Sequence, residues 1–568
     1  MHIHIVPNRT SPPAVLLRES YRDGDKVKKR TLANLSSLPM DQVELIRAVL
    51  RGERLVPAAE TFDIIRSRNH GHVDAVMIAM KQLGFGALVA AKPCRERDLV
   101  LAMVAARILA PNTKLATVRW WQGSTLADEL GVADATEDDL YAAMDWLLGQ
   151  QDRIQKRLAD RHLESGGLVL YDLSSSYFEG TCCPLAKRGY SRDGKKGTLQ
   201  VNYGMLTDGR GCPVAISVHE GNTADPVTLR PEIDRLRTQF AIDQLVIVGD
   251  RGMVSQKAVD QLRALDGVDW ISALKTGAIR ALVEGGTLQL DLFDQRNLCE
   301  LAHADYPGER LVACRNPQLA RLRAHKRDDM LAATTTALDA IAARVAAGRL
   351  TGADKIGLAV GKVINRHKMA KHILPDIGET HFTYQRDEAA IAREAALDGI
   401  YIVRTSVAAG RMDAAECVRG YKKLVQVERA FRTIKTIDLK VRPIHHRLAD
   451  RVRSHIFLCM LAFYVEWHMR ETWRSLLFAD EDQDAKATRD PVAPATRSDE
   501  AQAKISRRTT DDGFPLHSFQ TLIADLATIT RNSCRAPGAG ASAPTFDILA
   551  IPTPHQERAL ELIKSIQL

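Results

Sequence analysis

Three short, nearly continuous apolar runs constrain the fold of this chain more than any other feature. They are LVLYDL at 168–173, QLVIVGD at 244–250 and VDWISALK at 268–275, and all follow Gly166-Gly167. Runs of this length are typical of strands that are buried on both faces. The chain is therefore expected to build a central sheet whose two faces are covered by other elements.

The segments between these runs give the order of strands and helices. LQVNYGML at 199–206 and CPVAISVHEG at 212–221 have strand-like patterns and would form an antiparallel meander with the first run. Helical patterns at 226–240 and 254–266 alternate with the last two apolar runs. This order predicts an α/β fold in which a mixed sheet carries helices on its faces.

The 568 residues exceed what one hydrophobic core usually organises, so several structural units are expected. Changes of pattern along the chain predict an α+β multidomain organisation around the mixed sheet. The expected units are an N-terminal β segment (1–39), a helical domain (40–163), the sheet-containing core (164–275 and 398–470), an insertion subdomain (276–397), a flexible linker (471–513) and a helical C-terminal tail (514–568).

Composition excludes several classes of protein. The hydrophobic fraction of 45% and the charged fraction of 26% exclude a disordered or fibrous chain. The longest apolar runs, 99–110 and 456–465, are shorter than the roughly 20 residues that cross a bilayer, and the N-terminus lacks the pattern of a signal peptide. Nine cysteines without any C-x-x-C spacing favour reduced thiols. We therefore expect a cytoplasmic protein with no membrane partner.

Positive charge is concentrated in one stretch of the chain. Residues 419–453 hold eleven Lys or Arg and three acids, an excess equal to the formal net charge of +8 of the whole chain. A second basic cluster lies in a glycine-containing loop at 187–197. Basic residues concentrated along one element favour a polyanionic partner such as nucleic acid. The alternative is a solvated helix face.

Three acids lie where a sheet and a basic helix would bring them together. Asp172 ends the first buried run, Asp250 ends the fourth strand, and Glu428 lies within the basic helix. The first and fourth strands are neighbours in the expected sheet, so the two aspartates would be adjacent. Taken alone, Asp172 is as easily explained as a turn or helix cap, and Glu428 could form a salt bridge with Arg432 at i+4.

Adjacent carboxylates repel one another unless a cation neutralises them. Carboxylate oxygens are ligands that Mg²⁺ and Mn²⁺ prefer, and two such ions roughly 3.5–4 Å apart can activate a nucleophile at a phosphodiester. Asp172, Asp250 and Glu428 are therefore candidates to bind Mg²⁺ or Mn²⁺. Glu179 and Glu220 are nearby acids whose role the pattern leaves undecided.

The residues around Glu428 predict a surface that contacts nucleic acid. Tyr421 and Lys435 lie seven residues before and after it, so a regular helix would present all three on one face. A carboxylate flanked by a phenol and an ammonium could follow a phosphate backbone. Core packing explains neighbours such as Leu424 and Phe431 but not this trio.

Three motifs resemble those of a known family. DLSSSYFEG at 172–180, GDRGM at 249–253 and YKKLVQVERAFRTIK at 421–435 resemble the bacterial insertion-sequence transposases of the DDE type. The closer resemblance is to the insertion-sequence-four superfamily, whose last acid lies in a Tyr-Arg-Glu-Lys signature. It covers residues 165–470, with the motifs in the family's order and an insertion before the last acid. It implies an RNase H-like core, two divalent metal ions, and cleavage and joining of DNA.

The resemblance also assigns roles to single residues. Asp172, Asp250 and Glu428 match the metal-binding catalytic triad. Tyr421 and Lys435 match a tyrosine and a lysine that contact DNA near the cleavage site. The arginine that the family has three residues after the tyrosine is replaced here by leucine. Its charge would come from one of three nearby cations, Lys422, Lys423 or Arg432.

These implications define the expected reaction and partners. Water would first release a 3′-hydroxyl at the end of the element, and this hydroxyl would then attack target DNA at the same two metals. The partners would be double-stranded DNA and, because two ends must be held together, a second copy of the chain. The helical domain at 40–163 would bind the DNA ends, and the protein would be associated with the bacterial nucleoid.

Three alternatives stand beside this interpretation. A nuclease of the same fold would use the same triad without joining DNA, and a DNA-binding derivative of such an element would have lost catalysis. A zinc enzyme has little support, because the closely spaced histidine pairs lack the H-E-x-x-H spacing and no set of cysteines has the spacing of a tetrahedral site.

Overall fold

The computed structural model describes residues 1–8, 11–53, 61–289, 293–294, 296–482, 488–493 and 496–567. The chain divides into two compact units. The smaller unit comprises Met1–Arg68 and Thr530–Ala550, and the larger unit comprises Asn69–Ile529 and Ile551–Leu568.

The described residues of the smaller unit form two three-stranded sheets and one helix. Its elements are β1 His2–Val6, β2 Ala14–Asp23, β3 Lys26–Asn34, α1 Met40–Leu50, β4 Asp63–Asn69, β16 Thr530–Arg535 and β17 Thr545–Leu549. β1, β2 and β3 form one antiparallel sheet, and β17, β16 and β4 form the other. Asp23 pairs with Lys26, so Gly24 and Asp25 form a two-residue hairpin turn.

Three of these strands correct the sequence-based interpretation. β4 lies inside the range 40–163, which the sequence predicts to be helical, and β16 and β17 lie inside the tail at 514–568, which it also predicts to be helical. The sheet partner of β4 begins at Thr530. Because this pairing is so distant in sequence, no local pattern reveals it.

A helical bundle opens the larger unit. Its helices are α2 Gly71–Gln82, α3 Phe85–Val89, α4 Arg95–Leu109, α5 Lys114–Trp121, α6 Leu126–Glu129, α7 Glu137–Gly149 and α8 Gln151–His162. Thr136 and Asp139 form a capping box at the start of α7, as their spacing predicts. α4 is buried from Leu99 to Ile108 and packs against α7 and against α17 (Ala449–Thr472).

None of the described helices alone has the length and apolar composition of a membrane span. Only α4 and α5 taken together meet these criteria, and the pair is bent by 90° at its break.

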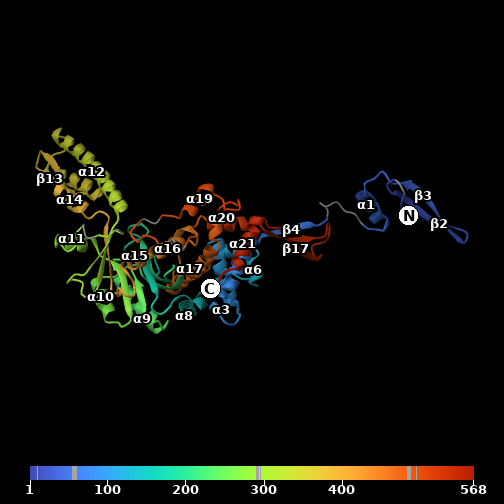
Figure 1. Ribbon diagram of the computed structural model, residues 1–568, viewed down its shortest axis with the longest axis horizontal. Helices are drawn as coiled ribbons and strands as arrows, with labels where there is room; N and C mark the ends of the chain where they lie inside the picture. The colour runs from blue at the N-terminus through green and yellow to red at the C-terminus, as the bar shows by residue number, and fades with distance from the viewer. Residues whose placement is uncertain are drawn as a thin grey trace. The chain divides into compact units, whose positions relative to one another are not determined.

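A nine-stranded mixed sheet forms the centre of the larger unit (Figure 1). Its strands are β5 Leu168–Tyr177, β6 Lys187–Arg188, β7 Leu199–Asp208, β8 Pro213–Glu220, β9 Leu245–Val248, β10 Val268–Ala273, β11 Leu298–Leu301, β12 Arg310–Arg315 and β15 Ile400–Thr405. Their order is β11-β12-β15-β10-β9-β5-β7-β6, and β8 also pairs with β7. β5, β7 and β8 are antiparallel, whereas β9 is parallel to β5 and β10. The expected mixed sheet is confirmed.

The apolar runs form strands because helices and loops cover both of their faces. All four residues of β9 are buried. α9 (Asp225–Thr238) and α10 (Gln256–Arg263) connect the strands from β8 to β10, while α16 (Leu424–Arg432) packs on β5 and α17 packs on β8. One hydrophobic core therefore continues from the helical bundle into the sheet.

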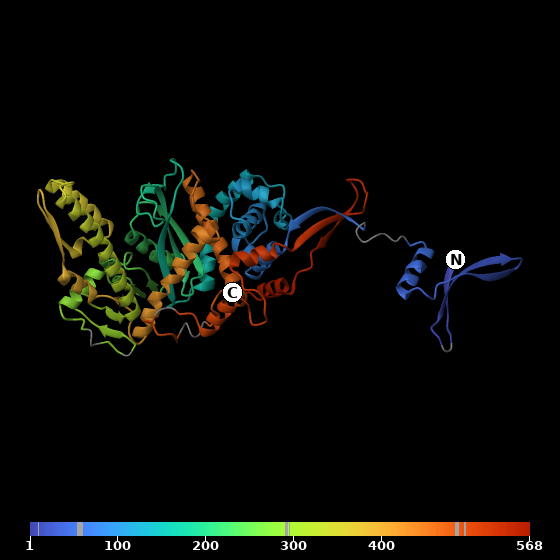
Figure 2. The ribbon, with the colours of Figure 1, turned by 90° about the horizontal axis from the view of Figure 1, so that it is seen from above.

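The range 276–397 is only partly an insertion. α11 (Thr276–Glu284) precedes β11 and β12, and these strands belong to the central sheet, where β12 pairs with β15. The rest forms a subdomain, yellow in Figure 2, whose own apolar core includes Leu338, Val360 and Phe382. Its elements are α12 Pro317–Ala346, α13 Ala353–Arg366, η2 Ala370–His372, β13 Ile373–Ile377, β14 Phe382–Arg386 and α14 Glu388–Ala395.

The sequence predicts one long regular helix for the basic segment after β15. The structure instead divides this segment into shorter elements. They are α15 (Ala414–Lys422), α16 and a π-helical turn, η3 (Thr433–Ile437). A π-turn closes i→i+5 hydrogen bonds and so rotates the residues after it relative to an α-helix. The expectation of a single face for Tyr421, Glu428 and Lys435 assumed one regular helix, whereas these residues lie on α15, α16 and η3, respectively.

The predicted flexible linker at 471–513 holds ordered elements where the structure describes it. They are η4 (Arg474–Leu476) and α19 (Asp499–Arg507). Lys504 of α19 donates hydrogen bonds to the carbonyl of Arg474 at 3.1 Å and to Glu481 at 2.6 Å. The abundance of small and charged residues in this stretch predicts flexibility, because composition alone does not reveal such contacts. Two further helices, α20 Phe519–Leu526 and α21 Pro554–Lys564, follow.

Candidate active site

The register of two parallel strands aligns the two predicted aspartates. The last residue pair between β5 and β9 joins Leu170 to Val248. Asp172 and Asp250 each follow this pair by two residues, and the charge of Asp250 acts on Asp172, so the two aspartates lie near one another beyond the carboxyl end of β9. Asp172 lies inside β5 rather than at its end, since β5 continues to pair with β7 as far as Tyr177.

Backbone donors orient one oxygen of each aspartate. Oδ1 of Asp172 accepts the N–H of Leu173 at 2.8 Å. Oδ1 of Asp250 accepts the N–H groups of Gly252 and Met253, both at 2.8 Å. A Cβ at position 252 would lie 3.2 Å from that oxygen, which explains the glycine of the GDRGM motif. Within the described residues, the Oδ2 atoms of both aspartates lack hydrogen bonds and remain available to a ligand.

The charges of all three predicted acids act on one another. Burial is the main cause that raises the pKa of Asp172 to about 7. The N–H of Leu173 and the cation of Arg192 lower this pKa, while the carboxylates of Asp250 and Glu428 raise it. Glu428 itself is exposed on α16. The three acids therefore share one neighbourhood, although among the described residues they form no group with all ligand atoms within 4.8 Å of one another.

Tyr421 faces the same acids. Burial raises the pKa of Tyr421 to about 12, the charges of Asp250, Glu428 and Asp172 act in the same direction, and Arg251 opposes them. The half-buried phenol is therefore protonated at neutral pH. It offers an O–H donor beside the three carboxylates.

Lys435 contacts the sheet rather than an open helix face. Its Nζ donates to Oγ of Ser174 at 3.1 Å and pairs with Oδ1 of Asp193 at 2.6 Å. Arg442 pairs with the same carboxylate. Ser174 lies two residues after Asp172 on β5, so both side chains point to the same face of the sheet. The buried ammonium thus lies on the side of the sheet that carries the acids.

The other three cations predicted to bind DNA differ in their surroundings. Lys422 donates to two backbone carbonyls in the segment 488–493, at 3.2 and 3.3 Å, and so fixes that segment. Lys423 and Arg432 are exposed. Among the ion pairs of the described residues, none joins Arg432 to Glu428, so the expected alternative of a simple i+4 salt bridge is absent from this structure.

A basic hollow of about 300 Å³ lies next to Lys435. Its lining carries four cations against one carboxylate, so it favours anions. The ammonium of Lys195 lies 3.6 Å from the centre of the Tyr177 ring. The hollow joins the two basic clusters seen in the sequence, and its lining residues are Tyr177, Asp193, Lys195, Lys435, Thr436, Lys440 and Arg442. Sequence reasoning counted the cations at 440 and 442 but did not single them out.

Glu179 and Glu220, the two other acids considered as metal ligands, lie apart from Asp172, Asp250 and Glu428. Glu179 is exposed, and its nearest ion-pair partner is His445 at 3.9 Å. Glu220 is exposed at the end of β8. Neither of them is among the charges that shift the pKa of Asp172. The geometry therefore favours Glu428 as the third acid.

The donor set fits hard divalent cations. Each aspartate keeps one oxygen anchored by the backbone, and the charges of Asp250 and Glu428 add to burial in disfavouring the ionised form of Asp172. A divalent cation would relieve this repulsion, and carboxylate oxygens are the ligands that Mg²⁺ and Mn²⁺ prefer.

Comparison with known proteins gives two family matches. The family model described as a transposase DDE domain matches residues 171–465, more than half of the chain. The family model of the N-terminal domain of IS1634 family transposases matches residues 3–59. A search of curated proteins gives no match.

Two solved structures resemble the chain at low identity. One is piggyBac transposase in a synaptic complex with hairpin DNA, with 8% identity over 80% of this chain and 77% of that chain and a TM-score of 0.35. The other is Mos1 transposase in a paired-end complex with the left transposon end, with 14% identity over 34% of this chain and 62% of that chain and a TM-score of 0.14.

Proposed function

We propose that this chain, which belongs to the DDE-domain transposases of bacterial insertion sequences, cleaves the ends of its own element and joins the freed 3′-hydroxyls to target DNA. The strand order β8-β7-β5-β9-β10, with three antiparallel strands followed by parallel ones, supports an RNase H-like core for this reaction. The single observation that supports the proposal is the β5–β9 register, whose last pair, Leu170 and Val248, lies two residues before Asp172 and Asp250.

The proposed metal ligands are Asp172, Asp250 and Glu428, and the proposed ions are two Mg²⁺ or Mn²⁺. When bound at such carboxylates, divalent cations activate the attacking oxygen and stabilise the leaving oxygen of a phosphodiester. The chain contributes the orientation of the ligands: backbone N–H groups hold both aspartates before any ion arrives. Glu428 is on a different element, α16, which packs directly on β5.

The cations beside the acids would bind the DNA backbone. In this proposal the basic hollow that includes Lys435 holds a phosphate, and exposed Lys423 and Arg432 add attraction along α16. The protonated phenol of Tyr421 donates a hydrogen bond to a phosphate oxygen near the cut. Lys422 instead fixes the chain segment that it contacts.

Two further parts of the proposal concern the DNA ends. The helical bundle α2–α8 would bind the ends of the element, and two copies of the chain would hold two ends together as a homodimer. A size measurement of the protein bound to end DNA, by light scattering, would test the second part. A complex with one chain per pair of ends would contradict it.

A strand-transfer assay tests the proposed reaction. A duplex that carries the element end with a labelled 3′-hydroxyl is incubated with the protein, Mg²⁺ and a supercoiled plasmid. Label joined to the plasmid is the expected result, and Asp250→Asn should abolish it. Cleavage of an uncut end without any joining would instead indicate a nuclease. Binding without cleavage would indicate an inactive DNA-binding derivative.

A further inference from the structure

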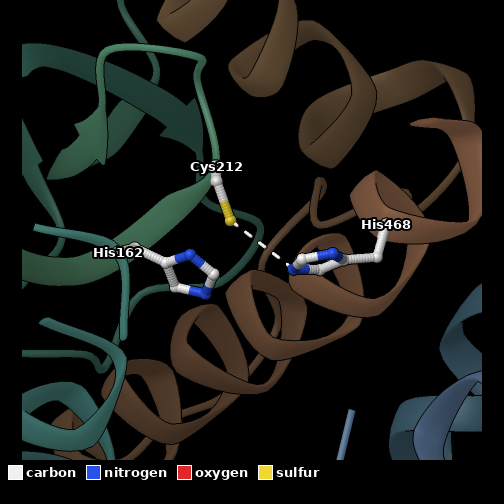
Figure 3. A group of neighbouring side chains, drawn as sticks. All are labelled: His162, Cys212 and His468. Carbon is white, nitrogen blue, oxygen red and sulfur yellow. Dashed lines mark hydrogen bonds between the residues drawn. The ribbon is translucent and has the colours of Figure 1, made fainter. Parts of the chain in front are cut away.

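A second group of ligand-type side chains lies outside the proposed active site. His162 at the end of α8, Cys212 just before β8 and His468 on α17 place their ligand atoms within 4.8 Å of one another. Sγ of Cys212 lies 3.8 Å from Nε2 of His468. Figure 3 shows the sulfur directed toward the space between the two imidazole rings. Cys212 and His468 are buried, and His162 is half-buried.

This donor set has the chemistry of a zinc site. Two imidazoles and a thiolate are typical ligands of Zn²⁺, and its bond lengths place tetrahedral ligand atoms roughly 3.3–3.6 Å apart. The distance between Cys212 and His468 exceeds this by only a few tenths of an ångström.

The surroundings hold these side chains in place. The hydroxyl of Tyr464 lies 3.0 Å from Nε2 of His162, and its ring packs edge-on against His468 with centroids 4.8 Å apart. Oδ1 of the buried Asp208 accepts the backbone N–H of Cys212 at 2.9 Å. Polar partners and a nearby carboxylate of this kind orient the ligands of metal sites and offset the positive charge of the ion.

We propose that His162, Cys212 and His468 bind one zinc ion that fastens α8 and α17 to the β7–β8 hairpin. Binding forms a Zn–S bond, and the thiol proton of Cys212 leaves to solvent. Because β7 pairs with β5 from Val169 to Tyr177, the ion would brace the strand that carries Asp172.

Cobalt substitution of the full-length protein tests this proposal. Co²⁺ bound to a thiolate gives a charge-transfer absorption band, which carboxylate sites cannot give. The band is expected in the unmodified protein and in Cys314→Ser, which alters another buried cysteine, but not in Cys212→Ser. The thiol requirement also excludes a contribution from the second close group among the described residues, His517, Asp525 and His555.

A second variant keeps the test decisive if Cys212→Ser does not fold. His162→Gln removes the half-buried ligand, and Zn²⁺ should raise the Tm of the unmodified protein but not that of this variant. Weaker zinc binding by at least tenfold is expected for the variant. Absence of both the cobalt band and the zinc-dependent rise in Tm from the unmodified protein would overturn the proposal. The three side chains would then be a metal-free packed cluster. Neither readout uses DNA. Failure of the zinc proposal would therefore not contradict the proposed transposition reaction.

Discussion

The two clusters of ligand-type side chains in the larger unit differ in charge and in chemistry. Asp172, Asp250 and Glu428 are like-charged groups, and two of them raise the pKa of the third. His162 and His468 are neutral at pH 7 because burial lowers their pKa values, and their neighbour Cys212 is a buried thiol.

Because of this difference, we expect ions at the two clusters to have different effects, one on activity and the other on stability. Repelling carboxylates do not stabilise a fold, so an ion at the acidic cluster is expected to matter for the reaction and little for the structure. The neutral cluster joins three elements that are distant in sequence, so an ion there is expected to matter for stability and little for the reaction. The predictions below test this division.

Removal of divalent ions should have the largest effect. Chelation is expected to abolish DNA cleavage and also to lower the Tm. Mg²⁺ or Mn²⁺ should restore cleavage, whereas zinc should restore the Tm, because the acidic cluster supplies hard ligands and the neutral cluster supplies a thiolate. Cleavage assays and thermal unfolding after each addition measure the two effects. Full recovery of both by one ion would contradict the division.

Neutralising one acid should lower cleavage by about a thousandfold, since the metal-bound transition state loses several kcal/mol of stabilisation. Asp172→Asn, Asp250→Asn and Glu428→Gln are each expected to show this loss while binding of end DNA and the Tm stay near those of the unmodified protein. Glu220→Gln is the matched control and should cleave normally. If Glu428→Gln cleaved as well as this control, Glu428 would not be the third acid.

Lys435→Ala should lower both stability and DNA affinity. The variant leaves the buried carboxylate of Asp193 with Arg442 but without its second cation, and we expect a loss of about 1–3 kcal/mol in the free energy of unfolding. Denaturant titration measures it. Lys435→Arg keeps the charge and should recover part of the loss. An unchanged unfolding midpoint for Lys435→Ala would show that this ion pair contributes little.

Lys423→Ala should have the smallest effect. The side chain is exposed, so stability should be unchanged, whereas affinity for end DNA should fall by about 1 kcal/mol and the salt dependence of binding should flatten by about one unit. Binding titrations at several salt concentrations measure both quantities. A change in the unfolding midpoint without any change in affinity would contradict the DNA contact assigned to Lys423.

Local patterns predicted the parts of the fold that depend on neighbouring residues. The buried strands β5, β9 and β10 follow from short apolar segments. They also predicted that the strands carrying Asp172 and Asp250 are adjacent.

Local patterns did not predict contacts between residues that are distant in the sequence. β4 pairs within a sheet whose other strands begin at Thr530, and β12 pairs with β15 across the insertion. The π-turn Thr433–Ile437, which contains Lys435, interrupts the regular helix that the sequence predicts. Cys212 and His468 are 256 residues apart, so no spacing rule connects them.

The most direct test of the central claim is anomalous diffraction from crystals of the protein grown with end DNA and Mn²⁺. The account predicts manganese peaks in contact with carboxylate oxygens of Asp172, Asp250 and Glu428 and next to a DNA phosphate. Manganese bound away from these three side chains, or held by the aspartates while Glu428 points elsewhere, would contradict it.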